Sequence, residues 1–471
     1  MVEEALGFDD VLIISKKSVV SSRKETDTST ILAKDLTIKI PIISANMVNV
    51  TEYKMAIAMA REGGIGIIHR FMSINEQVEE VKKVKRAENI VIEEPYTIKK
   101  TKTVKEAKEE MEKFNVNGLL VEENGKLVGI ITRRDVLLAD ENEKVENVMT
   151  KRKDLIFANY GISIDEAFKI FKKHKIEKLP LIDKKGFIKG LITLKDLISL
   201  KMHPNASKDK KGRLIVGAAI GIKDWYERTK ALIECETDVI VLDIAHGHSE
   251  QAIKTIKEIR KEFGDKLCLI AGNVATAEGT KDLINAGADA VKVGIGSGSI
   301  CITRIVTGCG VPQITALLEC SKVAKKENIP LIADGGIKNS GDIVKAIGAG
   351  ASSVMIGSLL AGTDESPGVL IVRNGKKYKF YKGMASSLAN IERKIREEKI
   401  LDEEFLDYVP EGLEAIVPYR GSVKDVITQL VNGLRSGLSY CGVKSVKELI
   451  GNAEFVKVNR IKESLPEIEF I

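Results

Sequence analysis

The feature that most constrains the fold is a series of short apolar runs, rich in valine and isoleucine, that end in glycine or polar residues. Charged segments with helical periodicity, such as SEQAIKTIKEIRKEFG (249–264), lie between them. Continuous apolar strands that alternate with amphipathic helices predict a parallel sheet covered by helices. The seven runs are residues 40–46, 64–69, 238–247, 267–273, 289–298, 329–336 and 352–358.

Seven strands of this kind favour an α/β fold built as a (β/α)8 TIM barrel over an open sheet. We expect the eighth strand before or after residues 375–420. Functional residues of such barrels follow the carboxyl ends of the strands. These positions carry Asn46, His69, Asp243, His246, Asn273, the loop around Cys301, Asp334 and Ser358.

The alternation stops between residues 93 and 204, where the chain repeats itself. GKLVGIITRRDVL (125–137) is echoed 61 positions later by GFIKGLITLKDLI (186–198). Each half is expected to form a helix, two short strands and a second helix. The expected domains are a first barrel part (1–92), the repeat pair (93–150 and 151–204) and a second barrel part (205–471).

Composition excludes several classes of protein. The net charge is +6 with both signs mixed along the chain, so no specific nucleic-acid partner is indicated, and an anionic small ligand explains the charge equally well. The amino-terminal residues are acidic and no stretch has the length of a membrane span, so we expect a cytoplasmic protein without a membrane partner. Six cysteines without C-x-x-C spacing argue against a disulfide framework and a zinc site.

The loop VGIGSGSICITRIVTGCGVPQ (293–313) concentrates glycine around one cysteine. Glycine allows positive φ and close backbone approach, while loop amides can bind anions and loop carbonyls can bind a cation. A buried structural thiol is the commoner fate of a cysteine. The position of Cys301 after a barrel strand favours a nucleophile instead.

This loop closely resembles the signature loop of the inosine monophosphate dehydrogenase and GMP reductase family, and the repeat pair resembles tandem CBS domains. The resemblance extends over essentially the whole chain, with further blocks in family order. They are GFDDVLI (7–13), SANM (44–47), AREGGIGIIH (60–69), DIAHGHS (243–249), AGNVATAEGT (271–280), IADGGI (332–337), GAGASSVMIGSLLAGTDESPG (348–368), YKGMAS (381–386) and VPEGLEAIVPYRG (409–421).

The resemblance implies a covalent mechanism at C2 of a purine nucleotide. Cys301 would attack C2, because a thiolate is both nucleophilic and a good leaving group. Thr303 and Glu411 would relay protons to the group at C2, and Asp334 would accept the ribose hydroxyls. The other implied contacts of GMP or IMP are Ser299, Gly336, Gly357, Ser358, Tyr381, Gly383 and Met384.

The resemblance also implies cofactors and assembly. Asp243, Asn273, Gly294 and Gly296 would face NADPH or NAD, whereas His246 and His248 in the same region are not assigned a role. The backbone carbonyls of Gly296, Gly298 and Cys301 match positions that hold a potassium ion in dehydrogenases of the family. The CBS pair would bind ATP or GTP, or serve only as a spacer or assembly domain, and the chain would form tetramers or octamers.

The two activities of the family differ in the flap, residues 383–421, where dehydrogenases carry an adjacent Arg-Tyr pair that activates water. The flap of this chain has no arginine followed by tyrosine, and helical apolar spacing runs from Ile391 through Ile400, Leu401 and Phe405. TALLEC (315–320) and GMAS (383–386) also favour GMP reductase.

Other features favour the alternative, IMP dehydrogenase. They are GVPQ, IADGGI, AHGHS, the long interval before VPEG, and the CBS pair itself. Val48 departs from both activities, which usually have aspartate there. A third hypothesis is a non-catalytic, nucleotide-sensing paralogue. We expect GMP reductase, because loss of a catalytic base lowers dehydrogenase activity more than differences in loop sequence do.

Overall fold

The structure is a computed structural model that describes residues 4–88, 91–396 and 409–458. The chain divides into two compact units, which are described separately. Unit 1 comprises Met1–Ala87, Asn205–Lys210 and Leu214–Ile471, and unit 2 comprises Glu88–Pro204 and Lys211–Arg213. Among the described residues, no helix combines the length and apolar character needed to cross a membrane.

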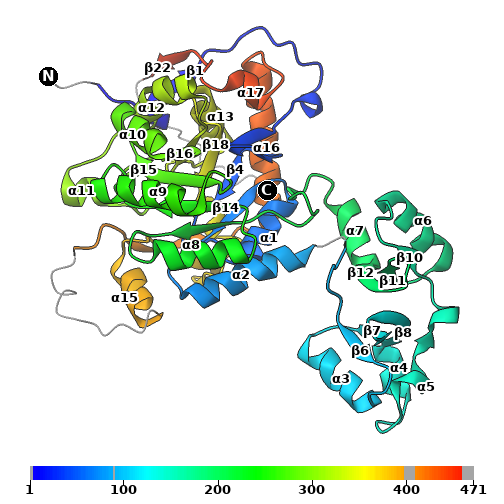
Figure 1. The fold of residues 1–471 in the computed structure, drawn as a ribbon. Coiled ribbons are helices and arrows are strands. Elements are labelled where there is room, and N and C mark those ends of the chain that lie inside the picture. Colours follow the sequence, from blue (N-terminus) through cyan, green and yellow to red (C-terminus); the bar gives the residue numbers. More distant parts are fainter. Residues whose placement is uncertain (1–3, 89–90, 397–408, 459–471) are drawn as a thin grey trace. The chain divides into compact units, whose positions relative to one another are not determined.

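Unit 1 is a closed barrel of eight strands in which every neighbouring pair is parallel (Figure 1). The predicted TIM barrel is therefore confirmed. In barrel order the strands are β4 (Ile42–Ser44), β5 (Ile65–Ile68), β13 (Gly217–Ile220), β14 (Val239–Asp243), β15 (Leu269–Val274), β16 (Ala290–Val293), β17 (Leu331–Asp334) and β18 (Ser353–Ile356).

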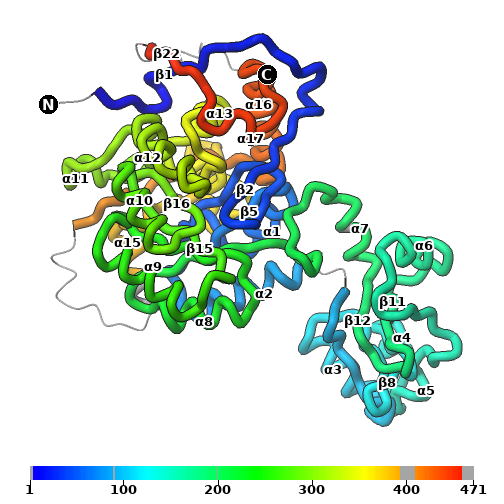
Figure 2. Tube along the Cα trace, turned by 45° about the horizontal axis from the view of Figure 1, so that its top comes forward, coloured from blue at the N-terminus to red at the C-terminus, as the bar shows by residue number. Residues whose placement is uncertain are grey.

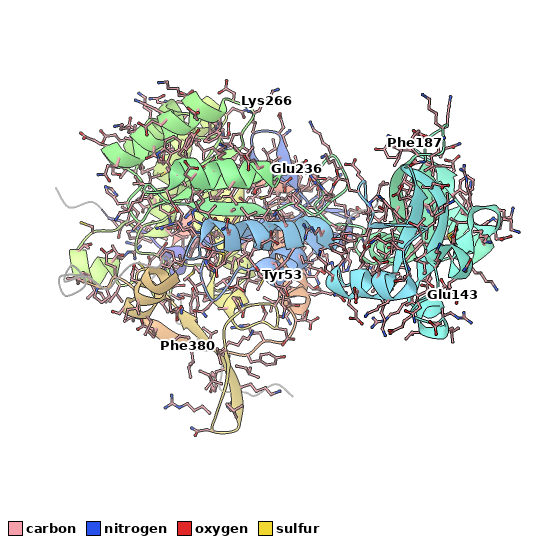
Figure 3. All side chains as sticks on the ribbon, turned by 60° about the horizontal axis from the view of Figure 1, so that its bottom comes forward. Tyr53, Glu143, Phe187, Glu236, Lys266 and Phe380 are labelled. Carbon is pink, nitrogen blue, oxygen red and sulfur yellow. The ribbon has the colours of Figure 1, made fainter. Side chains whose placement is uncertain are left out.

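The position expected for the eighth strand was wrong. That strand is β13, which directly follows the insertion and reads GAAI, so its small residues give a weak hydrophobic signal. Residues near 375–420 instead form an antiparallel sheet of β19 (Leu370–Arg373), β20 (Lys376–Lys382) and β21 (Glu414–Pro418). Figure 3 shows Phe380 on this sheet, whose β19–β20 hairpin projects from the barrel.

The helices that cover the barrel are amphipathic. In α9, Ala252, Ile256 and Ile259 are buried at helical spacing, Ser249 caps the amino terminus, and Gly264 ends the helix with φ of 71°. The barrel helices are α1 (Tyr53–Arg61), α2 (Ile74–Ala87), α8 (Trp225–Glu234), α9 (Glu250–Phe263), α10 (Ala277–Ala286), α11 (Thr303–Thr307), α12 (Gln313–Glu327), α13 (Ser340–Gly348), α14 (Ser358–Ala361) and α16 (Val423–Tyr440).

A hairpin closes the amino-terminal end of the barrel. Its strands are β2 (Thr30–Ala33) and β3 (Leu36–Ile38), and Leu32 and Ile38 are fully buried in the cluster that fills the barrel. The Cys268 thiol, just before β15, contacts the carbonyl of Ala33 at 3.8 Å. β1 (Val11–Ile13) pairs with β22 (Phe455–Lys457), which follows α17 (Val446–Leu449) in the chain, and Figure 2 shows the two strands together. The β2–β3 hairpin thus covers the barrel core at its amino-terminal end.

The flap begins as a helix. α15 (Ser387–Arg396) includes Ile391, the first position of the predicted apolar spacing. Ile400, Leu401 and Phe405 lie outside the described residues.

Unit 2 contains two similar halves with the predicted order of helix, two strands and helix. The first half has β6 (Thr97–Lys99), α3 (Val104–Lys113), β7 (Gly118–Glu123), β8 (Lys126–Thr132), α4 (Arg133–Leu138), α5 (Val145–Val148) and β9 (Thr150–Lys151). The second has β10 (Ala158–Asn159), α6 (Ile164–His174), β11 (Lys178–Ile182), β12 (Ile188–Thr193) and α7 (Leu194–Met202). In both halves a threonine hydroxyl donates to an aspartate three residues later, Thr132 to Asp135 and Thr193 to Asp196. An apolar cluster that includes Leu120, Ile130 and Leu191 joins the halves.

Candidate active site

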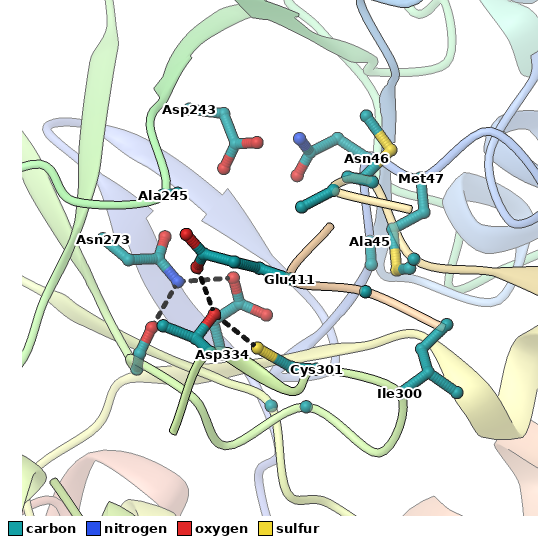
Figure 4. A pocket seen from close by; sticks show the side chains of 18 of the residues that line it. Ala45, Asn46, Met47, Asp243, Ala245, Asn273, Ile300, Cys301, Asp334 and Glu411 are labelled. Carbon is teal, nitrogen blue, oxygen red and sulfur yellow. Dashed lines mark hydrogen bonds between the residues drawn. The ribbon is translucent and has the colours of Figure 1, made fainter. Parts of the chain in front are cut away.

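A cavity of about 340 Å³ lies at the carboxyl ends of the barrel strands (Figure 4). Asp243 ends β14, Asn273 lies near the end of β15 and Asp334 ends β17, and all three line the cavity. Other predicted site residues in the lining are Gly294, Gly296, Gly298, Cys301, Thr303, Tyr381, Gly383, Met384 and Glu411. The structure therefore brings together residues that are up to 168 positions apart, from Asp243 to Glu411.

Lys292 is the centre of the polar network beneath this cavity. Its side chain is 2% exposed, and its ammonium nitrogen lies 2.6 Å from a carboxylate oxygen of Asp243 and 2.8 Å from one of Asp334. It also donates to the side-chain oxygen of Asn273. The Asn273 amide nitrogen donates in turn to Asp334 at 3.0 Å and to the Gly294 carbonyl at 2.7 Å. One buried cation thus holds residues from three neighbouring strands in fixed orientations.

The charges of this network stabilise one another. Burial alone would raise the pKa of Asp243, but the Lys292 ammonium, with smaller contributions from Arg70 and Asn46, brings it below its ordinary value. Burial likewise disfavours the charged form of Lys292, but Asp243 and Asp334 raise its pKa above the ordinary value. Asp243 and Lys292 are therefore both charged at neutral pH.

The glycines of the cysteine loop are required by its path. Gly294 has φ of 151°, and a Cβ atom there would lie 2.0 Å from the Asp334 carbonyl oxygen. The loop is also tied to the segment that carries Glu411. The Ile302 amide donates to the Glu411 carbonyl at 2.9 Å, and the Leu413 amide donates to the Ile300 carbonyl at 3.0 Å. Backbone pairing thus places two segments that are distant in the sequence side by side in the cavity wall.

Cys301, Thr303 and Glu411 form a continuous chain of hydrogen bonds. The Cys301 sulfur lies 3.2 Å from the Thr303 hydroxyl, which donates to a Glu411 carboxylate oxygen at 2.7 Å (Figure 4). A thiol, a hydroxyl and a carboxylate in this order can pass a proton away from the sulfur and return it to a nearby group. The geometry required for an activated nucleophile is therefore present.

Four residues assigned to the nucleotide phosphate do not line the cavity: Ser299, Gly336, Gly357 and Ser358. Two of them contact Tyr381, which does line it. The buried Tyr381 hydroxyl donates to the Met47 sulfur at 3.4 Å and has the Ser299 side chain as a neighbour that lowers its pKa. A Cβ atom on Gly357 would lie 2.8 Å from that oxygen. Burial raises the pKa of Tyr381 above its ordinary value.

Gly336 and Ser358 lie somewhat apart from this hydroxyl. Gly336 has φ of 83° and faces the Phe8 ring, while Ser358 begins α14 directly after β18. Ser299 and Gly357 therefore lie next to Tyr381, and none of the four residues forms part of the cavity wall.

The sequence analysis missed several residues of the cavity wall. Lys292 is recognisable as a single lysine inside the apolar run DAVKVG, although its partners are not evident from the sequence. Arg70 and Phe71 follow β5 directly, and Asn390 comes from α15. His248, which was left without a role, contacts Asp282 at 3.0 Å.

The unusual Val48 has a structural explanation. It is 7% exposed and packs in an apolar cluster with Phe71 and Ala389, beside Met384. Ala389 belongs to α15, so this cluster joins the flap helix to the loop after β4. A charged aspartate at this position would be buried among apolar side chains.

Comparison with known proteins agrees with this geometry. The family model described as IMP dehydrogenase / GMP reductase domain matches residues 5–466. The chain is 55% identical to inosine-5'-monophosphate dehydrogenase of Nitrosopumilus maritimus, over 97% of this chain and 96% of that protein. It is 46% identical to GMP reductase of Leishmania donovani, over 97% and 95%.

A solved structure is similar as well. The crystal structure of a cysteine-to-alanine variant of Trypanosoma brucei GMP reductase in complex with guanosine 5'-monophosphate superposes with a TM-score of 0.89. That protein is 45% identical, with 97% of this chain and 96% of the other covered. The resemblance inferred from the sequence is confirmed, and this chain belongs to the IMP dehydrogenase / GMP reductase family of oxidoreductases.

Proposed function

We propose that this chain is a GMP reductase, which converts GMP and NADPH into IMP, ammonia and NADP. The observation that carries the proposal is the flap sequence, which contains no arginine followed by tyrosine between Gly383 and Gly421. Without this pair the chain lacks the water-activating base of the dehydrogenases, whereas expulsion of ammonia needs no water. The Leishmania donovani and Trypanosoma brucei relatives bear the name GMP reductase, which supports the same choice.

The first half of the proposed reaction uses the hydrogen-bonded chain at the cavity. The Cys301 proton passes through Thr303 to Glu411, and the thiolate forms a bond to C2 of GMP while an electron pair moves onto the adjacent ring nitrogen. Glu411 then returns the proton through Thr303 to the amino group, which leaves C2 as ammonia. The ring double bond re-forms and C2 stays bonded to the sulfur.

The second half releases IMP. NADPH, when bound, supplies the hydride that C2 receives. As the carbon–sulfur bond breaks, its electron pair returns to Cys301, which regenerates the thiolate. Uptake of one proton from solvent restores the Cys301 thiol and closes the cycle, and the chain itself is neither oxidised nor reduced.

The remaining site residues bind and orient the reactants. Asp334, held by Lys292, would accept the ribose hydroxyls, and Ser299, Gly336, Gly357, Ser358 and Tyr381 would surround the phosphate, with Gly383 and Met384 next to the base. The nicotinamide would lie against Asp243, Asn273, Gly294 and Gly296. Arg70 and Phe71 in the same wall suit an anionic cofactor with a flat ring.

A potassium ion would be held by the carbonyls of Gly296, Gly298 and Cys301. Oxygen ligands without charge suit such an ion, and Gly296 and Gly298 lie in the cavity wall. The Gly298 carbonyl accepts one amide, that of Cys301 at 3.2 Å, which leaves a second lone pair. The ion would fix the path of the cysteine loop.

Reduced-nicotinamide absorbance tests the proposal with the purified full chain in potassium buffer. We expect absorbance to decay with GMP plus NADPH, together with release of ammonia, and to remain constant in the Cys301→Ala variant. Multiple turnovers with IMP plus NAD, and none with GMP, would refute it.

IMP dehydrogenase is the second candidate. It is favoured by the 55% identity to the Nitrosopumilus maritimus protein, which exceeds the 46% identity to the Leishmania donovani reductase. In that case Thr303 and Glu411 would activate water themselves. A non-catalytic paralogue, the third hypothesis, would behave identically with and without Cys301.

We propose that residues 93–204 of the chain are a tandem CBS pair that binds ATP or GTP. The repeated threonine–aspartate contacts of unit 2 support two equivalent halves, and a spacer without ligand is the alternative. We further propose a cytoplasmic homotetramer or octamer. Calorimetric titration with ATP and GTP, and light scattering, test these proposals.

A further inference from the structure

A second and larger cavity lies at the opposite end of the barrel from the active site. Its volume is about 1100 Å³. Its wall includes Asp289 just before β16, Leu331 at the start of β17 and Ser352 just before β18, together with Thr30 of the β2–β3 hairpin. These residues mark the amino-terminal ends of the strands, whereas Asp243 and Asp334 mark the carboxyl ends. The cavity is therefore separate from the site already described.

The lining of this cavity is strongly cationic. It contains five lysines: Lys34, Lys322, Lys325, Lys326 and Lys447. Among the described residues, Lys322 alone of these five has a carboxylate partner, Glu319 at 2.5 Å, and Lys34 donates to a backbone carbonyl. Within the ranges that the structure describes, the other three lysines have no ion pair. Three positive charges therefore share one concave surface without neutralisation.

The two carboxylates in the wall do not offset these charges. Asp289 accepts from the Arg260 guanidinium at 2.5 Å and from the Leu269 amide at 2.8 Å, so a separate cation already neutralises it. Asp27 accepts from the Ser29 amide at 2.9 Å, which leaves one acidic group opposite the lysines. The net charge of the lining favours an anion.

Other groups in the wall indicate the kind of anion. Ser29, Thr30 and Thr37 contribute hydroxyl-bearing side chains to the same lining. The wall also has an apolar part, which is formed by Ile31, Ile329 and Pro330. Ile31 is 47% exposed. A ligand with phosphates at one end and an apolar ring at the other would satisfy both parts.

From this cavity we infer a second ligand site that binds a small anion with several phosphate groups, of the size of a nucleoside triphosphate. Lys325, Lys326 and Lys447 contact the phosphates, and the hairpin hydroxyls complete their coordination. The inference does not depend on which reaction the active site performs, since none of these residues lines the active-site cavity.

Calorimetry with inorganic tripolyphosphate tests this site in the full chain. The test variant is K325Q/K326Q/K447Q, and the matched control is K254Q/K257Q/K261Q, which removes the same charge from exposed lysines of α9. Loss of three phosphate contacts at a partly exposed site should weaken affinity about tenfold or more. The control variant should bind like the parent chain, and both variants should retain the parent's catalytic activity.

Two further measurements separate loss of the site from a folding defect, and phosphate contacts from contacts with the base. K325R/K326R/K447R keeps the charge and should restore binding, so a folding defect in the glutamine variant cannot be mistaken for loss of the site. ATP in place of tripolyphosphate should bind more tightly at this site if the apolar wall holds the base, and should lose that gain in the glutamine variant. Equal affinities for parent and cavity variant, or equal weakening in the matched control, would overturn the inference.

Discussion

Replacement of Lys292 by methionine tests the buried charge network most directly. Methionine has nearly the same length and fills the same space, but it removes the ammonium that lies 2.6 Å from Asp243 and 2.8 Å from Asp334. Both carboxylates then lose the cation that they share, and Arg70 remains as a smaller positive influence on Asp243. Breaking a buried ion pair in this way costs about 3–5 kcal/mol of the free energy of unfolding. Each carboxylate side chain keeps 22% exposure, so we expect the lower part of this range.

The pH dependence of the variant's stability should differ from that of the parent chain. In the parent chain the pKa of Asp243 is held below its ordinary value, so its contribution to stability is present above the unfolded pKa and is lost only as the pH falls through the folded value. Without Lys292, burial raises the pKa of Asp243 instead. The variant should therefore regain stability on going from about pH 8 to about pH 5, where the parent chain changes little through this group.

Denaturant unfolding at these two pH values measures both effects. Lys292→Arg, which keeps the charge, and Lys254→Met, an exposed site on α9, serve as controls. If Lys292→Met unfolds at the parent's denaturant midpoint and shows the parent's pH slope, the network does not carry the stability assigned to it.

Three other changes test separate parts of the site. Glu411→Gln should lower kcat by about 10²–10⁴, because an amide cannot accept the proton from Thr303, while nucleotide affinity measured by calorimetry stays within about twofold. Gly294→Ala should abolish turnover and lower the unfolding midpoint, since its Cβ would overlap the Asp334 carbonyl at 2.0 Å. Gly7→Ala is the control, because Gly7 has φ of −97° and its Cβ would meet only an ordinary contact at 3.4 Å. Val48→Asp should destabilise the chain by about 2 kcal/mol or more, because a carboxylate would be buried against Phe71 and Ala389, and Val48→Ile should not; equal unfolding midpoints for these two variants would contradict the role of the cluster.

The parts of the site that could be predicted from the sequence are those that lie in recognisable local motifs. Cys301 and Thr303 occur in one glycine-rich loop, and Glu411 occurs in a recognisable block of the flap, so all three could be identified as candidate site residues before their distances were known. Their contacts of 3.2 and 2.7 Å depend on backbone pairing between residues 300–302 and 411–413, which no local pattern reveals. The barrel could be predicted for a similar reason, because each strand and helix repeats the same pattern.

The missed features depend on tertiary context. β13 has the sequence GAAI, whose small side chains are suited to a crowded barrel interior but look like a loop in isolation. Lys292 reads as an anomaly within an apolar strand, and only the closure of the barrel shows that carboxylates from β14 and β17 meet it. The apolar side chain of Val48 is likewise explained only by the tertiary structure, in which α15 packs against it.

The position of Lys292 also bears on how substrate and cofactor communicate. Asp334 is assigned to the ribose of the nucleotide and Asp243 to the nicotinamide side, yet both share one ammonium whose side chain is fully enclosed. A hydroxyl that donates to Asp334 draws negative charge away from Lys292. The electrostatic interaction between that ammonium and the Asp243 carboxylate then becomes stronger. Because the interior has a low effective dielectric constant, this exchange is not screened as it would be at the surface. Occupancy of the nucleotide side should therefore change cofactor affinity, and by linkage the reverse change must be equal, whichever of the two family reactions the chain performs.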